Sequence, residues 1–366
     1  MSSAVSDQAP TPNRARGFHP LVVSDVESLC DDAVAVTFAV PAELADEFAF
    51  AAGQSLTLRR VVDGVEQRRS YSICAPVGAP PRVGVREVTD GLFSTWLVRR
   101  VRAGDTIDVQ GPGGAFAADP AAGGVHLLIA AGSGITPMLS IAATMLANPA
   151  AQVILVYGNR RTRSVMFADE IADLKDRYHD RFDVVHVLSR EPRDVELFTG
   201  RIDSGRLREL LQTVIPTSDV DHFWLCGPHG MVTDAESVLA DLGVERQRIH
   251  RELFYVDDGT PPPQERHREP GVTGPRSEVT VVLDGRSVTG TLARADTILD
   301  GAEAFRPDLP FACKGGVCGT CRARVLCGEV DMRRNYALED DEVAAGFVLT
   351  CQTYPIGDAV TVDFDA

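Results

Sequence analysis

The sequence contains no apolar run long enough to cross a bilayer, which predicts a protein that does not span a membrane. Residues 1–16 are polar and lack a hydrophobic segment, so we expect a flexible tail there and not a signal peptide. These two absences together predict a cytoplasmic protein. A chain of 366 residues is long enough for two or three domains, each with its own core.

Basic residues are fewer than acidic ones, with 36 Lys and Arg residues against 52 Asp and Glu residues. Nucleic acids bind to basic surfaces, so a formal net charge of −16 argues against a nucleic acid ligand and suits a basic protein partner better. The sequence further lacks a Glu-x-x-His pair of the kind that holds two iron ions in helical bundles. Oxygen activation would therefore belong to a partner protein.

Cysteine occurs eight times, but without the paired spacing of a disulfide framework, which indicates a reducing compartment. Four of these residues follow the pattern C-x4-C-x2-C with a remote fourth, namely Cys313, Cys318, Cys321 and Cys351. This is the spacing of a plant-type [2Fe-2S] site, and the glycine-rich residues 314–320 would let the backbone wrap closely around a cluster. Structural zinc is the alternative, although zinc usually takes two short C-x2-4-C pairs. Cys327 lies outside the motif and is interpreted as a half-buried strand residue.

Residues 257–276 contain five prolines and three glycines among charged residues, which predicts a semi-extended linker. The linker separates residues 277–366, which carry the four cysteines, from the rest of the chain. Within that C-terminal part we expect strands at 278–283 and 287–292 and a helix near 297–304, and therefore a compact α+β domain.

Residues 17–120 alternate short β-rich runs with turn signals. We expect strands at 56–62, 65–73, 83–88 and 106–109, with an Asp63-Gly64 hairpin turn, a closing Gly111-Pro112 pair and one helix near 94–101. This pattern predicts a small antiparallel β-barrel.

Residues 121–256 follow a different pattern, in which apolar strands alternate with helices. Strands are expected at 125–131, 153–157, 184–188 and 222–225, and helices at 138–147, 168–178, 204–212 and 234–242. Alternation of this kind predicts a doubly wound parallel sheet.

A glycine loop, Gly132-Ser133-Gly134-Ile135-Thr136-Pro137, follows the first of these strands and opens a helix. Backbone N–H groups and the helix dipole at such a position form a phosphate site. Pro137 stands where the usual dinucleotide fingerprint has a third glycine, and a simple tight turn is an equal alternative when the loop is taken alone.

The ends of the second and third strands carry cations where an NAD site often has an acid. Arg160 and Arg161 follow the second strand, and Ser189 and Arg190 follow the third. Arginines at this place suit a 2′-phosphate and favour NADPH over NADH, unless they are simply solvated strand-end residues.

Three further short motifs lie at strand ends or helix starts: Arg69-Ser70-Tyr71-Ser72, Gly91-Leu92-Phe93-Ser94 and Cys226-Gly227-Pro228. The first two together offer an arginine for a phosphate, an aromatic ring for a flat ligand and a helix N-terminus for a pyrophosphate. Cys226 alone would be interpreted as a buried strand cysteine.

In this order, the motifs R-x-Y-S, G-x-x-S, G-S-G-I-T-P and C-G-P resemble the ferredoxin-NADP reductase superfamily, over about residues 18–254, with a ferredoxin-like β-grasp domain attached. The resemblance implies that the barrel binds flavin, as FAD in preference to FMN. It implies flavin contacts from Arg69, Tyr71, Ser72, Arg86, Val88, Gly91 and Ser94. It places NAD(P)H against Gly132, Ser133, Gly134, Thr136, Pro137, Cys226, Gly227 and Pro228. Cys226 would lie near the nicotinamide, and Phe254 would cover the flavin.

A narrower resemblance rests on D-L-P-F-A-C-K-G-G-V-C-G-T-C-R-A-R-V at residues 308–325, with N-Y-A-L-E and G-F-V-L-T-C-Q downstream. These segments are similar to the reductase subunits of bacterial phenylacetyl-CoA epoxidases in phenylacetate catabolism. This implies FAD, NADPH and a multisubunit diiron oxygenase partner. A flavin would convert the two-electron hydride of a nicotinamide into the single electrons that a cluster accepts. A reductase for a steroid or aromatic-ring hydroxylase, and a zinc-containing regulatory or binding module, are the alternatives.

Overall fold

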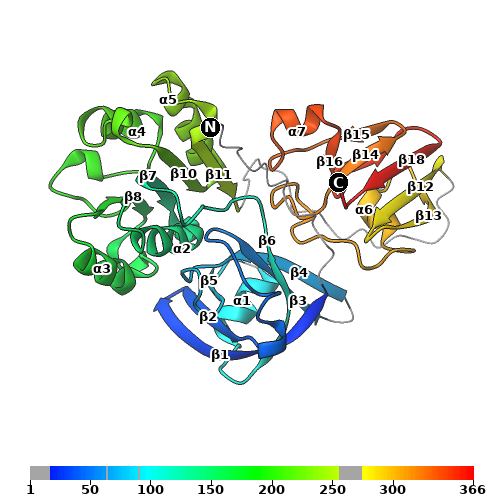
Figure 1. The fold of residues 1–366 in the computed structure, drawn as a ribbon, viewed down its shortest axis with the longest axis horizontal. Coiled ribbons are helices and arrows are strands. Elements are labelled where there is room, and N and C mark those ends of the chain that lie inside the picture. The colour runs from blue at the N-terminus through cyan, green and yellow to red at the C-terminus, as the bar shows by residue number, and fades with distance from the viewer. Residues whose placement is uncertain (1–16, 63–64, 90, 255–273) are drawn as a thin grey trace, which may run out of the picture. The chain divides into compact units, whose positions relative to one another are not determined.

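The structure is a computed structural model that describes residues 17–62, 65–89, 91–254 and 274–366 (Figure 1). The expected tail at 1–16, the turn Asp63-Gly64 and the linker residues 257–273 lie outside the described residues. The described chain falls into two compact units, residues 17–254 and 274–366. None of the helices in the described residues is both long and apolar enough to span a membrane.

The first part of the larger unit is an antiparallel β-barrel, as predicted. Its sheet has the order β4-β3-β6-β1-β2-β5, with β1 (Phe18–Cys30), β2 (Ala33–Ala39), β3 (Ser55–Val62), β4 (Val65–Ser72), β5 (Arg82–Arg86) and β6 (Thr106–Gly113). A bridge between Ile73 and Val83 joins the two ends of the sheet. A 3-10 turn, η1 (Ala42–Leu44), follows β2, and α1 (Leu92–Arg99) packs Phe93 and Leu97 into the barrel core.

Two details of the barrel differ from expectation. β6 continues through Gly111 and Pro112, which were expected to end it, because the pairing with β3 shifts between Ser55 and Thr57. Such a bulge tolerates a proline, which has no N–H for the ladder. The expected helix at 94–101 begins two residues earlier, at Leu92, directly after Gly91.

The second part of the unit is the predicted doubly wound parallel sheet. Its order is β11-β10-β7-β8-β9, with β7 (Gly124–Ala131), β8 (Ala151–Asn159), β9 (Phe182–Leu188), β10 (His222–Gly227) and β11 (Ile249–Leu253). The connections are α2 (Ile135–Leu146), α3 (Ala168–Arg177), α4 (Ser204–Thr213), α5 (His229–Asp241) and the 3-10 turns η2 (Gly132–Gly134), η3 (Thr162–Ser164), η4 (Glu196–Phe198), η5 (Thr217–Asp219) and η6 (Arg246–Arg248). The winding reverses between β7 and β10, so their carboxyl ends form the crevice where ligands bind in such sheets.

Helices α2 and α5 begin earlier than their patterns predict. The stretch expected as a loop, 132–137, is a 3-10 turn followed by the first turn of α2. α5 begins at His229 and not near residue 234, and the edge strand β11 was not predicted at all.

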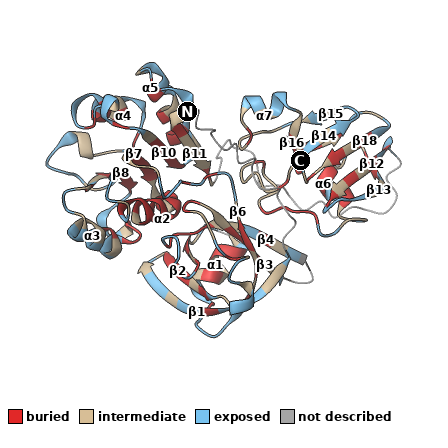
Figure 2. Cartoon of the chain, viewed as in Figure 1, coloured by how far each residue is buried: buried red, intermediate tan, exposed pale blue. Residues whose placement is uncertain are grey.

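α2 is buried on nearly all sides (Figure 2), because it lies between the sheet and the barrel. Ser140 donates a hydrogen bond to the Ala75 carbonyl at 2.7 Å, and the Thr144 hydroxyl accepts one from the Val77 N–H at 3.1 Å. On the same interface, a Cβ on Gly84 would lie 2.6 Å from the Thr136 methyl group. The barrel and the parallel sheet thus share one tightly packed helix.

The smaller unit is a mixed sheet of order β13-β12-β18-β14-β16, in agreement with the predicted α+β domain. Its strands are β12 (Arg276–Leu283), β13 (Arg286–Ala293), β14 (Arg322–Cys327), β16 (Phe347–Leu349) and β18 (Ala359–Asp363), and β15 (Val330–Met332) pairs with β17 (Thr353–Pro355). The helices are α6 (Ile298–Ala302) and α7 (Asp340–Ala344). Asp284 and Gly285 both have positive φ, as the predicted hairpin requires. Cys327 is exposed, so its prediction as half-buried was wrong.

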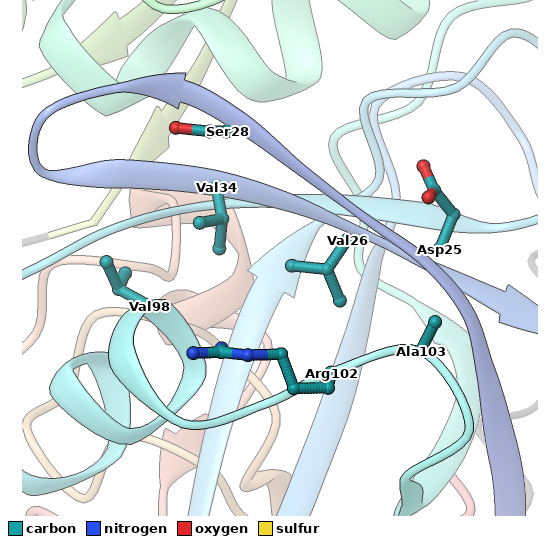
Figure 3. Close-up of a pocket in the computed structure, with 7 residues that line it drawn as sticks. All are labelled: Asp25, Val26, Ser28, Val34, Val98, Arg102 and Ala103. Atoms are coloured by element: carbon teal, nitrogen blue, oxygen red, sulfur yellow. The ribbon is translucent and has the colours of Figure 1, made fainter.

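A pocket of about 540 Å³ on the barrel lies between the β1–β2 hairpin and the end of α1 (Figure 3). Val26, Val34 and Val98 line it, with the charged side chains of Asp25 and Arg102. The Arg102 guanidinium is held by the carbonyls of Val101 and Arg99 at 2.7 and 3.2 Å. The pocket lies at the carboxyl end of α1, whereas the Gly91 motif lies at its amino end, so the pocket does not include that motif.

Candidate functional site

The glycine loop lies where β7 ends and α2 begins, at the point where the sheet reverses its winding. A Cβ on Gly134 would lie 2.2 Å from the Cys226 carbonyl oxygen, so only glycine lets α2 start this close to β10. The Thr136 hydroxyl donates to the Ser133 carbonyl at 3.0 Å, and the Tyr157 hydroxyl donates to the Gly132 carbonyl at 3.0 Å. The loop is therefore fixed, with the amino end of α2 at the switch point, where a phosphate can be bound.

The R-x-Y-S and C-G-P motifs come together across the crevice. Cys226 of β10 pairs with Glu252 of β11, and the Ser72 hydroxyl donates a hydrogen bond of 2.9 Å to the Glu252 carboxyl. Burial raises the pKa of Glu252 to about 8, against the lowering effect of the Ser72 hydrogen bond. Burial also raises the pKa of the Cys226 thiol, and the nearby Glu252 adds to this. At neutral pH this site therefore holds an uncharged carboxyl and an uncharged thiol.

Sequence analysis did not find Glu252. Its strand was not predicted, and the residue reaches the crevice only because β11 pairs with β10 in this register. The surrounding residues, Arg251-Glu252-Leu253, contain no motif. The only available signal was the position of Glu252 two residues before Phe254, the aromatic residue expected to cover the flavin.

The aromatic residues expected at the flavin lie near the same crevice. The Tyr71 ring lies 6.1 Å from the Phe93 ring, and burial raises the pKa of its hydroxyl. Phe254 is partly buried against the core that contains Cys226. Arg69 is exposed, and its guanidinium donates to the Arg68 carbonyl at 2.6 Å and to the Gln67 side chain at 3.3 Å.

Arg86 links the barrel to the nucleotide domain. Its guanidinium donates to the Ser164 carbonyl at 2.5 Å and pairs with Asp32 at 3.3 Å. A Cβ on Gly132 would lie 3.3 Å from the same guanidinium, so Arg86 also borders the glycine loop. The structure therefore brings this barrel residue to the loop after β7.

Ser94 shapes the turn that opens α1. Its buried hydroxyl accepts a hydrogen bond from the Val88 N–H at 3.0 Å and donates to the Gly91 carbonyl at 3.4 Å. Val88 and Leu92 are exposed beside this turn, at 59% and 67% of their full surface. The hydroxyl thus bonds to the backbone, and the first N–H groups of α1, which have no acceptor within the helix, lie at this end beside the two apolar side chains.

The loops after β8 and β9 lie side by side. The Ser189 N–H donates to the Asn159 carbonyl at 2.9 Å, and the Arg190 N–H donates to the Arg160 carbonyl at 2.8 Å. The side chains of Arg160, Arg161 and Arg190 are exposed, so the cations singled out in the sequence gather at one edge of the sheet.

Asn159, the last residue of β8, was not singled out as a ligand from the sequence. It is 7% exposed and its amide interacts with the Tyr157 hydroxyl, but no further hydrogen-bond partner is found for it in the described parts of the chain. A buried amide with unused hydrogen-bonding capacity at the carboxyl end of a strand is a candidate to contact a ligand.

The four motif cysteines form two pairs in the smaller unit. A hydrogen bond with Cys318 lowers the pKa of Cys313, and a hydrogen bond with Cys351 raises the pKa of Cys321. The Gly315 N–H points at the Cys313 sulfur at 3.3 Å. The positive φ of Gly316 and Gly319 bends the loop around the thiols.

These thiols fit a two-iron cluster, in which each iron takes two thiolates and backbone N–H groups face the sulfurs. Among the residues that the structure describes, no group of three or more His, Cys, Asp or Glu side chains is placed to hold a single metal ion.

Comparison with known proteins assigns a family model to each of the three domains. Residues 20–117 match the oxidoreductase FAD-binding domain, residues 128–237 the oxidoreductase NAD-binding domain, and residues 281–355 the 2Fe-2S iron-sulfur cluster binding domain. One of the subunits of the 1,2-phenylacetyl-CoA epoxidase of Escherichia coli K12 is 45% identical over 95% of this chain and 98% of its own. The chain belongs to the ferredoxin-NADP reductase superfamily.

One further relative and one solved structure match nearly the whole chain. The ferredoxin reductase component of 3-ketosteroid-9-alpha-monooxygenase from Rhodococcus rhodochrous is 34% identical over 94% of this chain and 96% of its own. The solved structure of phthalate dioxygenase reductase matches with a TM-score of 0.58 at 22% identity, over 95% of this chain and 98% of that one. This likeness shows a shared fold.

The protein is therefore an NAD(P)H-dependent flavin and iron–sulfur oxidoreductase, a reductase component of multicomponent oxygenases. It carries electrons from NAD(P)H through FAD and a [2Fe-2S] cluster, as the sequence predicts. The zinc-containing binding module is thereby set aside.

Proposed function

We propose that this reductase delivers electrons to the diiron oxygenase of a phenylacetyl-CoA epoxidase. The observation that carries the proposal is the 45% identity to the E. coli epoxidase protein across almost the full length of both chains. The steroid monooxygenase reductase, at 34% over a similar span, supports the same electron-transfer role with a different oxygenase.

In this proposal the crevice between barrel and parallel sheet binds flavin and nicotinamide face to face. Tyr71 and Phe254 provide apolar cover, while Ser72, Cys226 and Glu252 face the reacting end of the nicotinamide. Because burial raises the pKa of Glu252 to about 8, its carboxyl is mainly protonated at neutral pH. Its hydrogen bond with Ser72 holds both side chains in one position. The protein would thereby align the nicotinamide with the flavin and exclude water from between them.

The pyrophosphates would be held at two helix N-termini. Gly132, Gly134 and the start of α2 would hold that of NAD(P)H, and Gly91 with the start of α1 would hold that of FAD. Ser133, Thr136, Pro137, Gly227 and Pro228 would complete the nucleotide side. On the flavin side, Arg69 has an exposed side chain that can turn toward a phosphate, whereas Arg86 and Ser94 would act by shaping the surrounding loops.

The nucleotide is proposed to be NADPH. Arg160, Arg161, Ser189 and Arg190 lie at one sheet edge, where arginines and a hydroxyl suit a 2′-phosphate. Asn159 beside them is neutral, in contrast to the acid that often binds the 2′-hydroxyl of NAD at the end of the second strand.

Reconstitution tests the partner directly. The purified reductase would be mixed with the purified oxygenase component of a bacterial phenylacetyl-CoA epoxidase, phenylacetyl-CoA and NADPH. We expect NADPH consumption that depends on both the substrate and the oxygenase and that matches the epoxide formed. The oxygenase component of a 3-ketosteroid 9α-hydroxylase with its own substrate serves as the matched comparison. Coupled turnover with the steroid enzyme alone would contradict the proposal.

A further inference from the structure

One side chain, Gln352, ties together two segments that lie far apart in the sequence. These segments are the loop of the first three cysteines and the segment that follows the fourth. The Gln352 amide nitrogen lies 2.8 Å from the carbonyl oxygens of both Lys314 and Cys351, and 3.7 Å from the Cys351 sulfur. An amide nitrogen has two N–H groups, so three acceptors around it mean that the sulfur shares one of them.

The loop leaves room for this side chain. A Cβ on Gly316 would lie 3.0 Å from the Gln352 side chain, and Gly316 has a φ of +79° that favours glycine. The backbone of Gln352 is fixed as well, since its N–H donates to Leu349 at 2.8 Å and its carbonyl accepts from Arg333 at 3.0 Å. The amide therefore points into the loop from a rigid position.

Lys314, whose backbone carbonyl accepts a hydrogen bond from Gln352, is also fixed through its side chain. Its φ of +50° lies in the left-handed region, which is unfavourable for a residue with a side chain. Its ammonium group pairs with Asp300 of α6 at 2.9 Å and with Glu303, just after α6, at 2.7 Å. The turn at Lys314 is thus maintained by Gln352 on one side and by two carboxylates on the other.

We propose that Gln352 is a positioning residue of the cluster, which fixes the cysteine loop and raises the reduction potential of the cluster. A reduced cluster carries one more negative charge than an oxidised one. An N–H group that faces a ligand sulfur therefore stabilises the reduced form more than the oxidised form. The proposal does not depend on which oxygenase accepts the electrons.

Two substitutions separate donation to sulfur from simple space filling. Gln352→Met keeps the length of the side chain but removes both N–H groups, and Gln352→Glu keeps the size but replaces the donors with a negative charge. Gln152→Met is the matched control, because Gln152 is an exposed glutamine on β8 of the other unit. Iron and sulfide content and the flavin spectrum establish that each full-length holoprotein is loaded.

The decisive measurement is a redox titration of the full-length holoprotein monitored by electron paramagnetic resonance. At the potential that half-reduces the wild-type cluster, we expect the ratio of reduced to oxidised cluster to fall about three- to tenfold in Gln352→Met. A tenfold change corresponds to about 59 mV for one electron. The fall should be larger in Gln352→Glu, whereas the flavin potential and the Gln152→Met control should stay unchanged.

A fully loaded Gln352→Met protein with the wild-type cluster potential would overturn the proposal. Loss of the cluster from Gln352→Met, with Gln152→Met fully loaded, would support the role of Gln352 in fixing the cysteine loop. The effect of Gln352 on the reduction potential of the cluster would then be tested with Gln352→Glu. If all three variants keep the wild-type iron content and potential, Gln352 has neither role.

Discussion

The hydrogen bond between Ser72 and Glu252 joins a residue of the barrel to a residue of the nucleotide domain within the candidate site. Glu252 has a pKa of about 8 in the folded protein, against 4.5 for an ordinary glutamate. Between these values the folded state keeps a proton that the unfolded state has released. The contribution of Glu252 to the free energy of unfolding is therefore fully present below about pH 4.5. It decreases as the pH rises to about 8 and is absent above that pH.

Glu252→Gln should remove this pH dependence. We expect the melting temperature of the variant to fall less than that of the wild type between pH 5 and pH 9, because glutamine has no proton to release. Thermal unfolding followed by circular dichroism across this range measures the difference. If the melting temperatures of the two proteins changed equally with pH, the Glu252 carboxyl would titrate like an ordinary glutamate.

Arg190 tests the proposed choice of nucleotide. Arg190→Ala should raise the KM for NADPH about 10- to 100-fold and leave that for NADH nearly unchanged, because a charge-assisted contact to phosphate contributes roughly 1.5–3 kcal/mol. Steady-state kinetics with both nucleotides gives the two values. Arg177→Ala, an exposed arginine at the end of α3, is the control. Equal changes for NADPH and NADH would argue that Arg190 does not contact the 2′-phosphate.

Individual residues were predictable where spacing in the sequence carries the chemistry. The four motif cysteines follow from C-x4-C-x2-C and a remote fourth, and hydrogen bonds pair their thiols, while their role as cluster ligands stays a prediction. Glu252 and Asn159 could not be found in this way, because their positions depend on strand pairing and burial. Gln352 follows directly after Cys351, but only the folded loop shows which carbonyl its amide binds.

Among the elements, the contact of α2 with β10 determines the geometry of the glycine loop. Gly134→Ala would place a methyl group 2.2 Å from the Cys226 carbonyl oxygen, which the backbone can relieve only by moving α2 away. We expect a loss of about 1–3 kcal/mol in stability and weaker NADPH binding, since overpacking has this typical effect. Calorimetry and nucleotide titration measure the two effects.

Gly230→Ala is the matched control for that change. Gly230 lies in α5 with open space around its Cα, so alanine should stabilise the helix by roughly 0.5–1 kcal/mol. A neutral or stabilising result for Gly134→Ala would mean that α2 is free to shift.

Element boundaries were predictable where one face is regularly apolar. The parallel strands β7 to β10 lie close to their predicted ranges because most of their residues are apolar. β1 was not identified, since few of its thirteen residues are buried and its side chains do not alternate cleanly. The end of β6 was misplaced because a bulge accommodates Pro112, a tertiary effect that local turn rules do not capture.

At the scale of the whole molecule, the three cofactor domains should be separable by mutation. Cys318→Ser should abolish the cluster and leave the flavin in place, because the cysteine loop lies in the smaller unit and the flavin motifs lie in the larger one. Iron, sulfide and flavin analysis of the purified variant checks this. Cys327→Ser, at an exposed position on β14, should leave all three values unchanged. A cluster retained by Cys318→Ser, or lost from Cys327→Ser, would mean that the ligand set is different.

The order of electron flow is the central claim, and an anaerobic titration of the full-length protein with NADPH tests it most directly. Flavin absorbance and the paramagnetic signal of the cluster would be recorded at each addition. The account predicts that the flavin bleaches and that the cluster becomes reduced in the same titration, while Cys318→Ser shows the flavin change alone. A flavin that NADPH reduces beside a fully loaded cluster that stays oxidised would contradict it.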